Sequence, residues 1–156
     1  MLYQPQKGYL IDDGEPIYLA TTGKKLFKLS SWWQYQDSLG NNWVVPKSFI
    51  SDLASVPSII FWWQFGNYNV AAVAHDWIYI FGYLILVENG ELKKIDYTKK
   101  EADRIFADIN FTLGVSPIVN TAMYLAVRIF GRGIWTAKDK PEYGKTIEQL
   151  QLEFLS

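Results

Sequence analysis

The chain has 156 residues, of which 49% are hydrophobic and 20% charged, so it is long enough for one domain and too apolar for a disordered protein. It contains no cysteine, which excludes a disulfide scaffold and a thiolate metal site. The net charge of −1, from 15 basic and 16 acidic residues, gives no reason to expect a nucleic-acid partner. Three Lys-Lys pairs, at 24–25, 93–94 and 99–100, are expected on solvated surface.

Neither a transmembrane segment nor a signal peptide is predicted. The longest stretch without charge, residues 53–74, contains a proline, a glutamine, a glycine and two asparagines, and is too polar to cross a bilayer. Residues 1–7 are polar and lack a basic start that leads into an apolar run. We therefore expect a soluble protein.

The first third of the chain is predicted to be β-structure. Short strands, residues 9–11 and 17–20, are expected on either side of a turn at Gly14. Two aromatic-rich runs, residues 26–36 and 43–49, flank a cluster of turn-forming residues, which is typical of a hairpin.

The later part of the chain is predicted to be mainly helical. Ala-rich residues 69–81 indicate a buried helix that ends at Gly82. Thr98 and Glu101 have the spacing of a capping box, and the helix that they open ends near Gly114.

A small hairpin is expected between these two helices, because Asn89-Gly90 lies at the centre of residues 83–95. Ser116-Pro117 opens a further helix. Strands first and helices later predict an α+β fold, in which an N-terminal antiparallel sheet is followed by a helical layer.

We expect one domain at residues 1–135. Residues 136–156 are predicted to form a polar linker and a short C-terminal amphipathic helix.

The strongest candidate for chemistry is the pair His75 and Asp76. His75 is the only histidine, and Asp76 is the only charged residue between Leu53 and Val87. Both fall in the predicted buried helix, where a carboxylate must be paired, hydrogen-bonded or metal-bound. Histidine suits proton transfer near neutral pH, and Tyr79 lies one turn further on the same helix face.

Three further residues could meet this pair. Asp103 shares the core side of its helix with Phe106, where a carboxylate would suit a histidine that needs an orienting partner. Asp52 and Ser55 lie where strands give way to helices, and both are also well placed to cap the next helix. Ser55 is in addition a candidate nucleophile, although no nucleophile-elbow pattern surrounds it.

These residues leave three chemistries open. In the first, His75 is a general base on water, Asp103 orients it, and Asp76 and Asp52 help to hold calcium. In the second, His75 and the three aspartates form a transition-metal site, for which one histidine without cysteine is a weak ligand set. In the third, the polar cluster only stabilises the fold.

Three motifs follow one another along the chain: Ser51-Asp52-x-Ala54-Ser55-Val56-Pro57, His75-Asp76-x-x-Tyr79 and Glu101-Ala102-Asp103-x-x-Phe106. In order and spacing they resemble a family of small uncharacterised phage and prophage proteins, known as a domain of unknown function. The resemblance extends over most of the chain. It implies a viral setting and does not by itself imply an activity.

The two helices with the hairpin between them are also similar to the core of phospholipase A2, above all to its disulfide-free viral forms. This resemblance implies that His75 is the general base, Asp103 its partner, Tyr79 a hydrogen-bond donor to Asp103 and Asp76 a calcium ligand. It places the hairpin where that family has its β-wing. The glycine-rich calcium loop of that family has no counterpart before His75, and the β-rich first third of this chain has none in the family.

Two hypotheses follow. The chain is either a phage-encoded, phospholipase-like hydrolase with a lipid substrate, or a non-catalytic virion or tail-associated protein that assembles with other virion proteins. The first predicts an open cleft at His75, and in the second the His-Asp cluster is architectural. Both place the protein in the host cytoplasm or the virion.

Overall fold

The computed structural model describes residues 2–21, 24–51 and 68–156, and the elements below belong to this part of the chain. The larger sheet has five antiparallel strands in the order β1-β4-β5-β7-β8. Its strands are β1 (Tyr9–Asp13), β4 (Trp33–Gln36), β5 (Asn42–Val45), β7 (Tyr83–Glu88) and β8 (Glu91–Asp96). A smaller sheet, in the order β2-β3-β6, contains β2 (Pro16–Thr21), β3 (Lys24–Leu29) and β6 (Ile50–Ser51).

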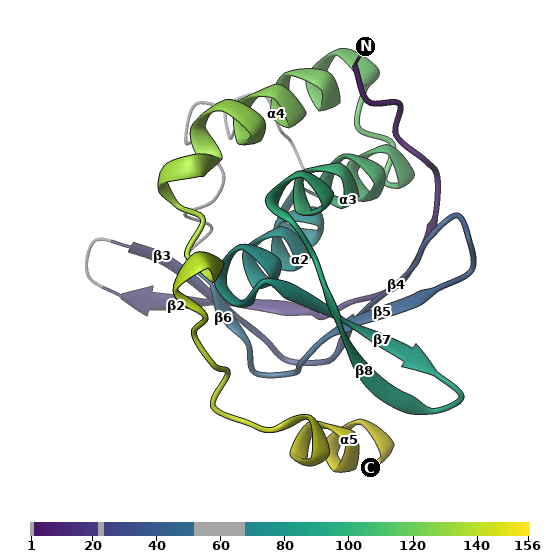
Figure 1. Ribbon diagram of the computed structural model, residues 1–156, viewed down its shortest axis with the longest axis vertical. Helices are drawn as coiled ribbons and strands as arrows, with labels where there is room; N and C mark the ends of the chain where they lie inside the picture. The colour runs from purple at the N-terminus through teal and green to yellow at the C-terminus, as the bar shows by residue number, and fades with distance from the viewer. Residues whose placement is uncertain (1, 22–23, 52–67) are drawn as a thin grey trace.

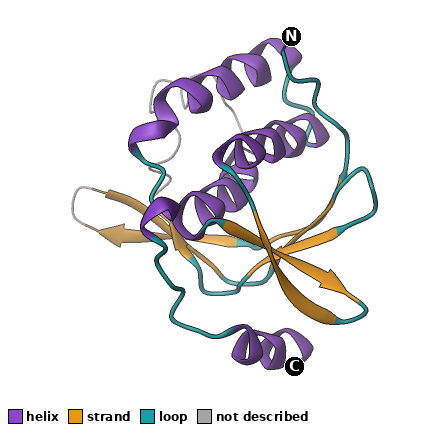
Figure 2. Cartoon of the chain, viewed as in Figure 1, coloured by secondary structure: helices purple, strands orange, loops and turns teal. Residues whose placement is uncertain are grey.

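Helices cover the larger sheet, mainly on one face (Figures 1 and 2). They are α2 (Tyr68–Phe81), α3 (Lys99–Thr112), α4 (Pro117–Phe130) and α5 (Ile147–Leu155), with the 3-10 turns η1 (Gly131–Gly133) and η2 (Ala137–Asp139). Figure 1 shows α2 and α3 above the sheet, α4 beyond α3, and α5 on the opposite side. The predicted α+β fold, with an N-terminal sheet and a helical layer, is confirmed.

The turn at Gly14 joins β1 to β2 but does not form a hairpin. β1 pairs with β4 and β2 pairs with β3, so the turn carries the chain from one sheet to the other. Gly14 (φ +77°) has the left-handed backbone that favours glycine, and its carbonyl accepts the N–H groups of Ser30 and Ser31. These bonds hold the turn against the connection between β3 and β4.

Both predicted hairpins are present, but the first predicted run, residues 26–36, is divided between β3 and β4, and only β4 pairs with β5. β4 and β5 pair in register, and β7 and β8 are joined by Asn89 and Gly90, which both have positive φ, as a tight hairpin turn requires. The second hairpin is not a separate wing, because β7 also pairs with β5 along Trp43 and Leu86. It therefore completes the main sheet.

The core lies between the main sheet and α2. Trp33 and Leu84 on the sheet and Trp77 on the helix are fully buried, and the Trp33 indole donates to the Val70 carbonyl at 3.0 Å. α2 ends at Gly82, whose φ of +80° stops the helix as the sequence predicts. This packing fixes one face of α2 and leaves its other face to α3.

The start of α3 is fixed by the predicted capping box. The Thr98 hydroxyl accepts the Glu101 N–H, and the Glu101 carboxylate accepts the Thr98 N–H. The cap sets the rotation of α3 so that Ala102, Asp103 and Phe106 face inward. α2 and α3 therefore meet along the side that carries the polar motif residues.

Candidate functional site

The structure brings together His75 and Tyr79 of α2 and Asp103 of α3. His75 Nε2 lies 2.8 Å from Asp103 Oδ1, and the Tyr79 hydroxyl donates to the same oxygen at 2.5 Å. His75 and Tyr79 are one helical turn apart on α2, so both reach the same point on α3. The side chains of His75 and Asp103 are completely buried.

Two cations meet the second oxygen of Asp103. Lys99 Nζ lies 2.9 Å from Asp103 Oδ2, and Arg128 of α4 reaches it at 2.8 Å. The expectation that Lys99 is solvated is wrong: only 16% of its side chain is exposed, and it also donates to the Val127 carbonyl at the end of α4. Each carboxylate oxygen thus accepts two donors, and Asp103 joins three helices.

The sequence analysis did not identify Lys99 or Arg128 as partners of Asp103. The i,i+4 spacing of Lys99 and Asp103 on one helix was an available signal. Arg128 lies 25 residues from Asp103, and nothing local in the sequence indicates their contact.

These contacts set the protonation of the cluster. Burial favours the neutral form of Asp103, but hydrogen bonds from His75, Tyr79 and Lys99 outweigh it and lower the pKa of Asp103 to about 2. Burial also lowers the pKa of His75 below its usual value. The bond to Asp103 raises this pKa, but it offsets only part of the effect of burial, and the nearby positive charge of Lys99 lowers the pKa further. Asp103 is therefore ionised and His75 neutral at pH 7.

The tautomer of His75 follows from its partner. An ionised carboxylate can only accept, so Nε2 carries the hydrogen and Nδ1 keeps a free lone pair. Nδ1 is buried and has no hydrogen-bond partner among the described residues. A histidine with one nitrogen held by a carboxylate and the other free is the arrangement that a general base needs.

In the described part of the chain, no open cleft reaches His75. His75 is 0% exposed, and the rings of Tyr79 and Phe106 lie 4.1 and 4.8 Å from its ring centroid. The small residues Ala71 and Ala72 are also buried, so the space they leave on α2 is filled from within the fold.

Asp76 lies apart from this hydrogen-bonded cluster. It is 3% exposed and accepts a hydrogen bond from the Ser51 hydroxyl of β6. The other predicted residues here, Asp52 and Ser55, lie outside the described residues. Within the described ranges no group of three or more His, Asp or Glu side chains is placed to hold a metal. Asp76 and Ser51 supply only part of the six to eight oxygens that calcium takes, so the described residues alone do not make a calcium site.

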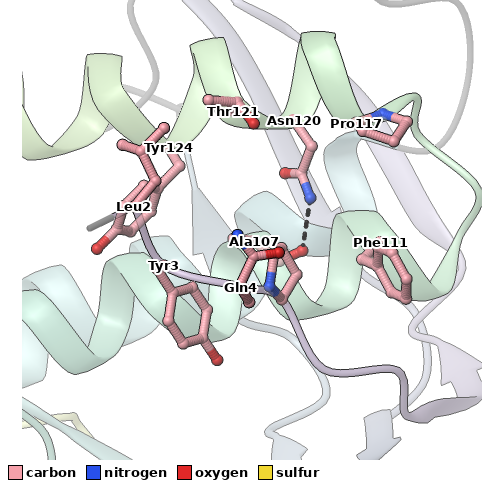
Figure 3. A pocket seen from close by; sticks show the side chains of 10 residues that line it. Leu2, Tyr3, Gln4, Ala107, Phe111, Pro117, Asn120, Thr121 and Tyr124 are labelled. Atoms are coloured by element: carbon pink, nitrogen blue, oxygen red, sulfur yellow. Dashed lines mark hydrogen bonds between the residues drawn. The ribbon is translucent and has the colours of Figure 1, made fainter.

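A cavity of about 270 Å³ lies elsewhere, between the N-terminal residues and the α3–α4 pair (Figure 3). Leu2, Phe111 and Pro117 are among its lining residues. Asn120 also lines it and donates to the Ala107 carbonyl at 2.9 Å. His75 does not line this cavity.

In the described part of the chain, no helix has both the length and the apolar character to span a membrane.

The comparisons with known proteins agree with the expected membership of an uncharacterised family. No curated protein and no solved structure matches the chain. Residues 27–127, more than half of the sequence, match the family described as "Protein of unknown function (DUF1353)". The matched segment includes His75, Tyr79, Lys99 and Asp103 of the buried cluster and ends one residue before Arg128. The chain belongs to the DUF1353 family of proteins of unknown function.

Proposed function

We propose that this protein is a phage- or prophage-encoded hydrolase of lipid esters in which His75 is the general base. One observation carries the proposal: His75 Nε2 is held by the ionised Asp103, while Nδ1 has no partner among the described residues. Buried polar atoms are nearly always hydrogen-bonded, so a free nitrogen at the centre of a helix pair needs an explanation.

The proposed step is a proton transfer. Nδ1 takes a proton from a water molecule whose oxygen attacks the ester carbonyl, and the resulting imidazolium gives this proton to the leaving alcohol. Asp103 stabilises the imidazolium, while Tyr79, Lys99 and Arg128 hold the carboxylate in place. Because His75 is enclosed, the step requires that neighbouring side chains move to admit the substrate.

The similarity of the His-Asp-x-x-Tyr helix to phospholipase A2 supports an ester substrate, and it is also the source of the calcium prediction. We expect calorimetric titration to show calcium binding to the wild-type protein and its loss in Asp76→Asn. Absence of binding at millimolar calcium would remove the metal from the proposal.

The experiment that tests the proposal is an assay of fatty-acid release from phospholipid vesicles. His75→Gln keeps an N–H that can reach Asp103 but lacks the base, and we expect turnover to fall by roughly 10²–10⁴-fold. Asn120→Ala, which removes another buried polar side chain, is the control and should keep its turnover. Equal turnover in wild type and His75→Gln would refute the role of His75.

A second candidate is a non-catalytic virion or tail-associated protein, and the complete burial of His75 and Asp103 favours it. In this case the cluster only ties α2, α3 and α4 together. His75→Ala should then lower the free energy of unfolding by roughly 1–3 kcal/mol, and the protein should be found in purified particles with other virion proteins. A stable monomer that is absent from particles would count against this role.

A further inference from the structure

The outward face of α4 is apolar. Asn120, Met123 and Val127 are buried on the side that faces α3. On the opposite side, Ile118 is 82% exposed and Ile129 63%. Ala122 and Leu125 lie between them at helical spacing, and together these four residues form a continuous stripe, which we call the α4 stripe.

Such a face is unusual on the outside of a protein. A surface helix normally carries polar residues opposite its buried side, whereas a helix that is apolar all round is normally covered. The α4 stripe extends over eleven residue steps, or about 16 Å at 1.5 Å per residue. Figure 1 shows α4 at the edge of the molecule, with α3 between it and the main sheet. An exposed apolar surface of this kind marks an interaction site.

The apolar surface continues beyond the helix. Phe130, directly after Ile129, is 64% exposed, and beside the N-terminal half of α4 Leu2 and Phe111 are 51% and 39% exposed. Leu2 and Phe111 also line the cavity of about 270 Å³ next to α4 (Figure 3). Exposed apolar side chains therefore occur near α4 outside the stripe as well.

Helix α4 and the turn η1 that follows it carry charges of one sign. From Pro117 to Gly133 the sequence contains no aspartate or glutamate, and its two charged residues are Arg128 and Arg132. Arg128 is paired with Asp103. Arg132, in η1 directly after α4, is exposed and forms no ion pair within the described part of the chain. An apolar stripe next to an unpaired cation matches the acyl and phosphate layers of an anionic lipid surface.

We propose that α4 lies on anionic lipid surfaces, with the α4 stripe in the boundary between headgroups and acyl chains and with Arg132 against the phosphates. A second copy of the chain that packs α4 against α4 fits this face less well, because residues 117–133 offer no carboxylate to pair with Arg132. The inference goes beyond the proposed hydrolysis, since adsorption requires no reaction at His75.

Vesicle flotation tests this proposal. Vesicles of phosphatidylcholine with phosphatidylserine are compared with vesicles of phosphatidylcholine alone, in calcium-free buffer. We expect the wild type to float with the anionic vesicles and to bind less as salt is raised. Ile129→Glu should weaken the partition by about tenfold or more, because it places a charge in the stripe and repels anionic lipid. Arg132→Glu should weaken it on anionic vesicles only.

Leu39→Glu is the matched control, because Leu39 is 85% exposed but lies in the turn between β4 and β5. It should float like the wild type. Circular dichroism checks that each variant is folded. The proposal is overturned if the wild type does not float with anionic vesicles, or if Ile129→Glu floats equally well. It is also overturned if light scattering shows a wild-type dimer that Ile129→Glu dissociates, since a second copy would then cover the stripe. Flotation measures binding and not turnover, so its result can be interpreted even if the protein proves not to be a hydrolase.

Discussion

Asp103 carries the negative charge on which the buried cluster depends. Lys99 and Arg128 both face its Oδ2, and each is mostly buried at this contact. If one partner of a buried ion pair is removed, the remaining charge stays desolvated without compensation. The cluster therefore contributes stability only while the carboxylate is present.

Asp103→Asn should consequently be one of the most destabilising single substitutions in the chain. The amide leaves two cations without a counter-charge, and we expect the free energy of unfolding in urea to fall by roughly 3–5 kcal/mol. Glu88→Gln, which breaks the exposed pair with Lys93, is the control and should cost less than about 1 kcal/mol. A similar decrease in the free energy of unfolding in both variants would contradict this role of Asp103.

The neutral state of His75 makes stability depend on pH. Burial lowers the pKa of His75 in the folded protein below that of the unfolded chain. Folding therefore releases a proton, and the stability that His75 contributes is complete above its unfolded pKa of about 6.5 and is lost as the pH falls below it. Urea unfolding at a series of pH values between about 7.5 and 5 should show this decline. The decline should be smaller in His75→Gln, and a wild type that gains stability on acidification would contradict it.

At the scale of elements, the junction of α4 and η1 packs directly against the buried cluster around Asp103. Gly131 has an ordinary helical φ of −70°, but a Cβ there would collide with the Tyr79 hydroxyl and lie 3.0 Å from Lys99 Cε. A side chain at this position would thus push apart two of the groups that bind Asp103.

Gly131→Ala should therefore destabilise the protein by overpacking, by roughly 1–3 kcal/mol. Gly133→Ala is the matched control two residues later, because a Cβ there meets no atom within 4 Å. The control should change the free energy of unfolding by less than about 0.5 kcal/mol. Thermal or urea unfolding measures the stability of the two variants. Equal stability would contradict the prediction and show that the side chains of Tyr79 and Lys99 can move to make room for a Cβ.

Local sequence signals predicted most elements, and long-range contacts explain what they missed. Helix periodicity placed Asp103 on the core side of α3, and the capping box at Thr98 located the start of that helix. The pairing of β7 with β5, by contrast, joins strands about forty residues apart. The burial of His75 also depends on packing between helices, and residue spacing along one helix does not reveal it.

At the scale of the whole molecule, the C-terminal helix closes the far side of the main sheet. Leu150 of α5 is fully buried, and the Gln151 side chain accepts the Leu92 N–H and donates to the Gly90 carbonyl of the β7–β8 hairpin. The hairpin that completes the sheet is thus held by residues near the end of the chain.

Leu150→Ala should lower the free energy of unfolding by roughly 2–5 kcal/mol, as expected for truncation of a buried leucine. Leu152→Ala on the same helix is the control, since Leu152 is 74% exposed, and it should have little effect. Calorimetric or urea unfolding measures both. Equal effects of the two substitutions would mean that α5 does not dock on the sheet in solution.

The claim that matters most is that His75 holds a free lone pair at Nδ1. His75 is the only histidine, so the nitrogen-15 spectrum of its imidazole can be assigned without ambiguity. The most direct measurement is this spectrum as a function of pH. We predict a neutral ring at pH 7 with the hydrogen on Nε2, and a pKa below the ordinary value. A ring that is protonated at neutral pH, or that carries its hydrogen on Nδ1, could not act as the proposed base and would contradict the account.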